Sequence, residues 1–399
     1  MKKKTFKRKK GTFFVSLFVL VLIIISLTIR FVSKEESINN LSLNSLYLND
    51  KKINKVNKAN IQNKIDDKIK TKNSSKDSKN TPKKSTYTDI LMSFVGDCTL
   101  GTDSKFSGET MPVTLSNNNM DFSYLFKNVS SYFKKDDLTI ANLETTFTDA
   151  TIKNPKTFNF KAPPSYVESL TLGSIEAVNI SNNHIYDYKE KGYNDTKKTL
   201  EQEKINYFGE GTIWKTTVKN KKFAFLGYRG WEDNIDFDKL KSEITQLKSE
   251  EYTVIISFHW GIERQYHPIE FQKKLAHFCI DNGADLIIGH HPHVLQGIET
   301  YKGKYICYSL ANFCFGGNNN PQDKDTMIVQ TQFNFKNDKL IETGLKVIPC
   351  SISSVKYKND YCPTPLKGDN YTRVLNKLNE ISPKSGFKLS EDFHFEKHE

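Results

Sequence analysis

Residues 283–297 read GADLIIGHHPHVLQG, an apolar run that ends in three histidines within four positions: His290, His291 and His293. The whole chain of 399 residues has only nine histidines. Neighbouring imidazoles must stay neutral or be paired, and imidazole is the commonest metal-binding side chain. The cluster therefore predicts a metal site, with an incidental surface cluster as the alternative.

Polar residues end other apolar runs in the same way. Asp97 ends ILMSFVGD, Glu144 follows LTIANL, Asn183 and His184 follow AVNISN, and His259 follows VIISF. Each alone has an ordinary interpretation, as a helix cap, a turn residue or a buried histidine. Together, carboxylate, amide and imidazole ligands without a thiolate favour Zn²⁺, Mn²⁺ or Fe²⁺, and a pair of such ions can drive phosphoryl transfer.

The elements that must position these residues follow from the hydrophobic pattern. Helix-like stretches at residues 190–204, 236–250 and 269–283 separate short apolar runs that read as strands. This alternation predicts an α/β fold whose sheet is buried on both faces. Ligands of such sheets bind at the carboxyl ends of the strands, so five strands would bring their polar residues to one rim.

Charge divides the chain into a tail and a body. Residues 1–86 hold 21 Lys and Arg against 6 Asp and Glu, out of 58 and 46 in the whole chain. The remaining body is therefore slightly acidic, with a net charge of −3 against +12 for the whole chain. A nucleic-acid-binding domain normally has a basic face, so we expect no nucleic-acid partner.

The tail begins with a basic segment, residues 1–11, followed by TFFVSLFVLVLIIISLTI, which has no charged residue. Eighteen helical residues reach about 27 Å, enough for a hydrocarbon core. We assign residues 12–32 as a transmembrane signal-anchor, because the run lacks the small-residue exit of a cleaved signal peptide. The cations before it predict a single-pass protein of the cell membrane with an extracellular C-terminal domain and lipid as one partner.

Residues 33–87 form a Lys/Asn/Ser-rich segment with too little apolar surface to fold, which predicts a disordered linker. Its positive charge could contact an anionic polymer or lipid, or it could be a solvated spacer. The six cysteines form no CxxC pair, and several occupy apolar positions typical of small core residues.

The blocks MSFVGDCTLG, ANLETTFTD, NISNNHIYDY, SFHWGIERQYHP, GADLIIGHHPHVLQGIE and YSLANFCFG resemble the CapA/PgsA family of capsule and poly-γ-glutamate synthesis proteins. The resemblance runs from Asp89 to Pro349 and places a CapA-type domain at residues 88–350, with a C-terminal extension at residues 351–399. The family is in turn similar to calcineurin-like metallophosphoesterases. This implies a four-layer α/β/β/α sandwich and one or two divalent ions, Mn, Zn or Fe.

The resemblance also implies roles for single residues. The metal ligands would be Asp97, Glu144, Asn183, His259, His291 and His293. His184 would act on the leaving group, and Asp187 could hold its ring in one tautomer. Glu263 and Arg264 are candidates for contacting an anionic substrate, or form a surface ion pair.

This sequence departs from the phosphoesterase pattern at two points. Thr99 stands where the pattern has a histidine two residues after the aspartate, and Glu144 replaces the bridging aspartate. Both departures fall on the same metal position, so the number of ions stays open.

Three functions follow as expectations. The first is a membrane-anchored protein that assists the assembly or export of an anionic polymer beside membrane-bound synthase subunits. The second is a metal-dependent phosphoesterase that acts on a cell-envelope substrate. The third is a metal-free scaffold that keeps only the fold.

Overall fold

The computed structural model describes residues 85–398. The predicted basic segment (residues 1–11), the anchor (12–32) and residues 33–84 of the linker lie outside the described residues. Within residues 85–398, no helix has the length and apolar character needed to cross a membrane. This part of the chain has a mixed α/β fold with two large β-sheets.

The first sheet has nine strands, with the order β16-β15-β14-β1-β2-β5-β6. Strands β1, β2, β5 and β6 are parallel, whereas β14 and β15 form an antiparallel hairpin beside β1. β13 pairs with the end of β1, and β17 pairs with β15. The strands are β1 (Tyr87–Thr99), β2 (Leu138–Leu143), β5 (Ala177–Asn179), β6 (Asn206–Phe208), β13 (Asn312–Phe315), β14 (Asp325–Lys336), β15 (Lys339–Ser351), β16 (Thr364–Pro365) and β17 (His394–Lys397).

The second sheet has six strands, with the order β11-β12-β10-β9-β8-β7. Its four central strands are parallel, and the two edge strands β7 and β11 are antiparallel to their neighbours. The strands are β7 (Trp214–Val218), β8 (Lys221–Gly230), β9 (Thr253–Trp260), β10 (Leu286–His290), β11 (Leu295–Tyr301) and β12 (Lys304–Leu310). A separate two-stranded sheet pairs β3 (Thr146–Phe147) with β4 (Lys161–Ala162).

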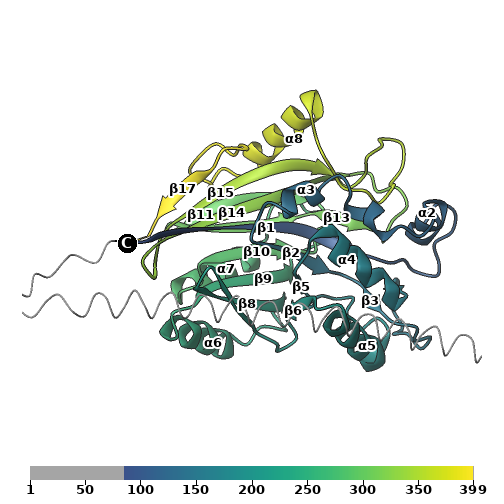
Figure 1. Ribbon diagram of the computed structural model, residues 1–399, viewed down its shortest axis with the longest axis horizontal. Helices are drawn as coiled ribbons and strands as arrows, with labels where there is room; N and C mark the ends of the chain where they lie inside the picture. Colours follow the sequence, from purple (N-terminus) through teal and green to yellow (C-terminus); the bar gives the residue numbers. More distant parts are fainter. Residues whose placement is uncertain (1–84, 399) are drawn as a thin grey trace, which may run out of the picture. The chain divides into compact units, whose positions relative to one another are not determined.

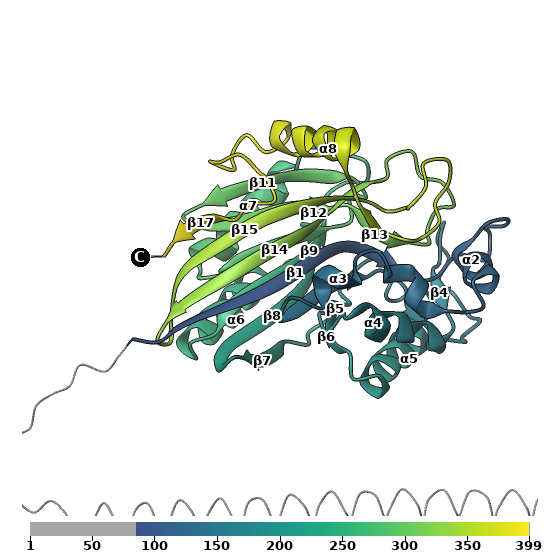
Figure 2. The same cartoon turned by 45° about the horizontal axis from the view of Figure 1, so that its top comes forward.

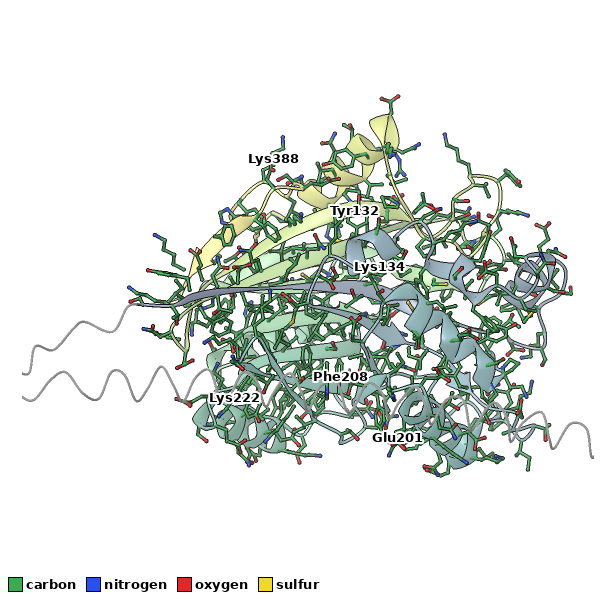
Figure 3. The ribbon with its side chains drawn as sticks, in the orientation of Figure 1. Tyr132, Lys134, Glu201, Phe208, Lys222 and Lys388 are labelled. Carbon is green, nitrogen blue, oxygen red and sulfur yellow. The ribbon has the colours of Figure 1, made fainter. Side chains whose placement is uncertain are left out.

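Three apolar clusters fix how these elements pack. One cluster joins β1, β2 and β14 of the first sheet to β8, β9, β10 and β12 of the second, so the two sheets pack face to face. Phe208 belongs to this cluster and lies inside, whereas Lys222 and Glu201 are exposed (Figure 3). Because apolar side chains fill both faces of the central strands, these strands read as nearly continuous hydrophobic runs.

Helices cover the outer faces of the sheets (Figure 1). The helices on the first sheet are α2 (Met111–Asn117), α3 (Ser130–Phe133), α4 (Glu168–Gly173) and α5 (Lys189–Gln202), with the 3₁₀ turns η1 (Phe122–Phe126) and η2 (Pro164–Val167). Helices α6 (Phe237–Ser249) and α7 (Glu270–Asp281) cover the second sheet. The three longest of these, α5, α6 and α7, occupy the stretches where the sequence predicted helices.

Residues 351–398 pack onto both sheets. Helix α8 (Gly368–Glu380) contacts β11 of one sheet and β15 of the other, as Figure 2 shows. Its buried residues Val374 and Leu378, together with Leu389, belong to the apolar cluster between the sheets. The C-terminal extension is therefore part of the same core.

Candidate metal centre

Polar residues occupy matching positions on neighbouring strands of the first sheet. Asp97 of β1 is paired in register with Asn142 of β2 on one side and with Asn312 of β13 on the other. Asn142 is in turn paired with Asn179 of β5. Asn142 Nδ2 donates to Asp97 Oδ1 (2.8 Å), and Asn179 Nδ2 donates to Asn142 Oδ1 (2.9 Å). A buried row of polar side chains thus crosses the sheet where its parallel strands end.

A second row crosses the other sheet, where His259 of β9 is paired with His290 of β10 and Arg229 of β8. The two rows meet between the sheets. Asn142 Nδ2 lies 3.2 Å from His259 Nδ1, and His290 Nδ1 lies 3.6 Å from Asp97 Oδ1. The five strand ends expected at one rim therefore belong to two sheets, three strands from one and two from the other.

One group of donors surrounds His259 Nε2. Asn183 Oδ1 lies 2.9 Å from it, His291 Nδ1 lies 3.1 Å from it, and Glu144 Oε1 lies 3.3 Å from it. Glu144 and His259 are completely buried, yet Glu144 Oε1 has no hydrogen-bond partner among the described residues. Two imidazoles, an amide oxygen and a carboxylate oxygen so close together form a ligand set that can hold one divalent ion.

A second group shares the carboxylate of Glu144. His293 Nδ1 lies 3.3 Å from Asp97 Oδ2, and His293 Nε2 lies 3.9 Å from Glu144 Oε1. Ligand atoms of Glu144, His291 and His293 all lie within 4.8 Å of one another. Thr99, which stands at the expected histidine position, donates its hydroxyl to Glu144 Oε2 at 3.4 Å. This group offers fewer strong ligands than the first, because a threonine hydroxyl replaces an imidazole.

Burial and mutual repulsion set the charges of these groups in the protein without metal. Burial and the neighbouring charge of Asp97 raise the pKa of Glu144 to about 7. Burial lowers the pKa of His259 to about 3 and that of His291 to about 2, so both imidazoles are neutral. A neutral imidazole is the form that binds a metal.

The pKa values of Asp97 and His293 shift against the effect of burial, because each residue has an oppositely charged neighbour. Burial alone would raise the pKa of Asp97, but its hydrogen bond with His293 and the nearby histidines lower it well below the usual range. Burial alone would lower the pKa of His293, but Glu144 and Asp97 raise it to about 10. Without a metal, these two residues form an ion pair in which Asp97 is completely buried and His293 is partly buried.

His184 and Asp187 lie next to this centre. Asp187 Oδ2 lies 2.7 Å from His184 Nδ1 and also accepts a hydrogen bond from the main-chain N–H of Phe160 (2.6 Å). Asp187 is completely buried, and the ring of Phe160 packs on that of His184 at a centroid distance of 4.4 Å. These contacts fix the imidazole orientation beside Asn183 and leave His184 Nε2 without a partner among residues 85–398.

Glu263 and Arg264 lie in an exposed loop after β9. The main-chain N–H of Arg264 donates to the carbonyl of Pro292 (2.8 Å), which attaches the loop to the histidine turn. The negative charge of Glu263 is the last of several causes that raise the pKa of Glu144 and of His293. No ion pair joins Glu263 and Arg264 among residues 85–398, and contact of either side chain with an anionic substrate stays a prediction.

The turn that carries the histidines has an unusual backbone. His291 and His293 have φ angles of 95° and 57°, in the left-handed region that non-glycine residues rarely adopt. Just before them, a Cβ atom on Gly289 would lie 2.0 Å from the carbonyl oxygen of Tyr308. Residues held in this way cluster at functional sites, where the surrounding structure compensates for the strain.

Sequence reasoning missed several residues of the centre. Asn142 and Asn312 looked like ordinary strand residues, although an asparagine within an apolar run was a readable signal; Asn312 Oδ1 lies 2.8 Å from His293 Nδ1. Trp231 packs edge-on against His291 at a centroid distance of 4.9 Å. Lys156 contacts both Asp187 and Asn183 from a distant loop, and no local pattern marks it.

Comparison with known proteins agrees with the motifs. The model of the family "Bacterial capsule synthesis protein PGA_cap" matches residues 91–317, which include every predicted site residue. The chain is 30% identical over 269 residues to "Capsule biosynthesis protein CapA" of Bacillus anthracis, covering 60% of this chain and 63% of that protein. It is 28% identical over 333 residues to "PGA biosynthesis protein CapA" of Bacillus subtilis (strain 168), covering 77% of this chain and 82% of the relative.

A more distant relative is the "Probable polyglutamine synthesis accessory protein" of Mycobacterium tuberculosis, which is 26% identical over 208 residues and covers 44% of this chain and 55% of that protein. Among solved structures, a hypothetical protein from Thermus thermophilus matches 65% of this chain and 99% of its own length, with 15% identity and a TM-score of 0.41. Because the family model matches more than half of the chain, the protein belongs to the family of bacterial capsule synthesis proteins, PGA_cap, as its resemblance to CapA and PgsA proteins predicted.

Proposed function

We propose that this protein is a membrane-anchored, extracellular accessory protein of capsule or poly-γ-glutamate synthesis, whose metallophosphatase-like centre binds a divalent ion. The observation that carries the metal centre is the group of donors around His259 Nε2, together with the buried Glu144 Oε1, which accepts no hydrogen bond from the described residues. A buried carboxylate oxygen without a hydrogen bond costs free energy, which a bound cation would offset. Two large sheets packed face to face support a four-layer metallophosphoesterase-like sandwich.

The proposed ligands divide into two positions. Glu144, Asn183, His259 and His291 would hold the first ion, which is Mn, Zn or Fe. Asp97, His293 and Glu144 would hold a second ion less firmly, because Thr99 supplies only a hydroxyl. When bound, such an ion supplies Lewis-acid chemistry and a nucleophile at neutral pH.

The cellular part of the proposal rests on the family and on the N-terminal sequence. The relatives are named as capsule and PGA biosynthesis proteins or as an accessory protein of polymer synthesis. Residues 12–32 would anchor this chain in the membrane, near membrane-bound synthase subunits. The linker, with its excess of lysines, would then face an anionic polymer outside the cell.

A second function, that of a metal-dependent phosphoesterase on a cell-envelope substrate, is favoured by one observation. His184 is oriented through Nδ1 by the buried Asp187 and lies next to Asn183, a proposed ligand. A histidine held in this way beside a metal ligand can give a proton to a leaving oxygen through Nε2. Turnover of a phosphoester by the metal-loaded protein, lost in His184→Asn with its metal retained, would establish this function.

The metal content of the purified full-length chain tests the proposal directly. We expect one to two ions per chain by elemental analysis, and their loss in the double variant His291→Ala/His293→Ala. His267→Ala is the matched control, since His267 is exposed in the loop after β9 and should leave the metal content unchanged. A wild-type chain that stays metal-free after Mn²⁺ or Zn²⁺ is added would leave the scaffold function instead.

A further inference from the structure

The loop between β3 and β4 extends to the candidate metal centre. Its residue Lys156 places Nζ 2.5 Å from Asp187 Oδ1, 2.7 Å from the main-chain oxygen of Asn183 and 3.3 Å from His184 Nδ1. The side chain of Lys156 is 31% exposed, whereas that of Asp187 is completely buried. One ammonium group thus touches three residues of the segment that carries the proposed amide ligand and the proposed proton donor.

The two oxygens of Asp187 have separate partners. Oδ2 lies 2.7 Å from His184 Nδ1 and accepts the N–H of Phe160 at 2.6 Å. Oδ1 has no aligned hydrogen bond and lies against the ammonium group of Lys156 as an ion pair. A buried carboxylate without a compensating charge is strongly unfavourable, so the ammonium group of Lys156 stabilises the Asp187 carboxylate that orients His184.

Lys156 also acts on Asn183 from the main-chain side. It donates to the carbonyl oxygen of Asn183, whose side-chain Oδ1 lies 2.9 Å from His259 Nε2. We propose that Lys156 is a positioning residue, which fixes Asn183 and Asp187 relative to each other and so aligns the amide ligand with the histidine beside it. This inference rests on the proposed metal centre, and it assigns Lys156 no contact with metal or substrate.

A neighbouring contact separates this role from simple attachment of the loop. Asn154 donates its main-chain N–H to the Asp187 carbonyl (2.9 Å) and its side-chain amide to the Tyr186 carbonyl (2.6 Å). The loop therefore stays attached when Lys156 loses its charge. Lys153, an exposed lysine of the same loop whose Nζ lies 3.4 Å from Ser104 Oγ, offers a matched control.

The experiment compares the full-length wild type with Lys156→Met, Lys156→Arg and Lys153→Met after removal of metal. Co²⁺ titration followed by visible absorption reports both the affinity and the ligand geometry. Hydrogen–deuterium exchange of the peptide that covers residues 181–188 reports the order of the segment without any metal. The melting temperature reports global stability.

We expect Lys156→Met to weaken Co²⁺ binding by about tenfold or more, the usual effect of losing a partner that orients a ligand. Its absorption spectrum should change, and exchange in residues 181–188 should be faster than in Lys153→Met. The melting temperature should also fall, because the buried Asp187 carboxylate loses its ion-pair partner. Lys156→Arg should restore much of the affinity, and Lys153→Met should match the wild type. Wild-type affinity, spectrum and exchange in Lys156→Met would overturn the assignment.

Two further results remain decisive. If the wild type binds no Co²⁺, the proposed metal centre fails, but hydrogen–deuterium exchange still tests the role of Lys156. Faster exchange of residues 181–188 in Lys156→Met, but not in Lys153→Met, supports the positioning role. Exchange rates equal to those of the wild type refute it. If Lys156→Met does not fold, Lys156→Gln takes its place in the same comparison, because glutamine keeps a donor for the Asn183 carbonyl without the charge.

Discussion

At the scale of single residues, the candidate centre holds several ionisable groups away from water, so its stability without metal must depend on pH. Burial lowers the pKa of His259 to about 3, of His290 to about 4 and of His291 to about 2. In the unfolded chain these histidines take up protons as the pH falls through about 6.5. The folded state does not, so acid favours the unfolded state in that range.

We therefore expect the chelated protein to lose stability between about pH 6.5 and pH 4, by up to about 1.4 kcal/mol per pH unit for each of the three histidines. Glu144 offsets one of them, because its pKa is raised from 4.5 to about 7 and the folded state takes up this proton before the unfolded chain does. His293 has the opposite effect on stability, because its pKa is raised to about 10 in the folded protein. Its contribution to the free energy of unfolding is complete below about pH 6.5 and is lost as the pH rises toward 10. Urea unfolding at several pH values measures both trends.

His290→Gln is the informative variant for this pH dependence. It removes one buried imidazole that has no hydrogen bond at Nδ1 among the described residues, and it leaves the proposed ligands in place. Below about pH 6.5, the free energy of unfolding should then change less steeply with pH. The difference should equal the contribution of one histidine, roughly 1.4 kcal/mol per pH unit. A chelated wild type that is equally stable at pH 7 and pH 5 would contradict the account.

At the scale of elements, the close approach of β10 to β12 decides where the histidine turn lies. A Cβ atom at Gly289 would lie 2.0 Å from the carbonyl oxygen of Tyr308 and 2.6 Å from Trp260 Nε1. The Tyr308 carbonyl belongs to the backbone of β12 and can move only if β12 shifts. Only glycine therefore fits at position 289 between these strands. The same strand then leads directly into His290 and His291.

Gly289→Ala should therefore destabilise the protein by about 1–3 kcal/mol, as overpacking in a core does, and should also weaken metal binding. Gly211→Ala is the comparison, since nothing lies within 4 Å of its added Cβ and only its φ of +84° resists the change. Urea unfolding and a Co²⁺ titration of both variants give the two readouts. Unchanged stability and affinity in Gly289→Ala would show that β10 can move away from β12.

The helix α8 provides a second element whose place the structure alone shows. Leu378 is completely buried in the cluster between the two sheets, whereas Asn376 on the same helix is exposed. Leu378→Ala should cost about 2–5 kcal/mol of unfolding free energy, because it leaves a cavity in this core. Asn376→Ala should stay within about 0.5 kcal/mol of the wild type. Equal unfolding curves for the two variants would mean that α8 does not contribute to the core.

At the scale of the whole molecule, the proposed function requires the body to be outside the cell and attached to the membrane. The full-length chain should remain with the membrane fraction after alkaline extraction, and a protease added to intact cells should digest its body. A chain without residues 1–32 should leave the membrane fraction, because it lacks the apolar run that fits a hydrocarbon core. Recovery of the full-length chain in the soluble fraction would argue against the anchor.

The sequence by itself determined the features that depend on neighbours along the chain. Apolar runs that end in Asp97, Asn183, His259 or His291 are local patterns, and they were sufficient to predict an α/β fold and a cluster of polar side chains at strand ends. The three predicted helices were likewise readable, since their apolar residues repeat at helical spacing. The hairpin of β14 and β15 and the helix α8 were not identified, although each has its own local pattern.

Only the tertiary structure decided which residues meet across the chain. The strand ends come from two sheets that pack face to face, and no periodicity states to which sheet a strand belongs. Asn142 matters because register places it between Asp97 and His259, and Lys156 matters because a loop carries it to Asp187. The packing of distant segments sets such contacts. A buried charge or amide is stable only with a partner, and here that partner lies far away in the sequence.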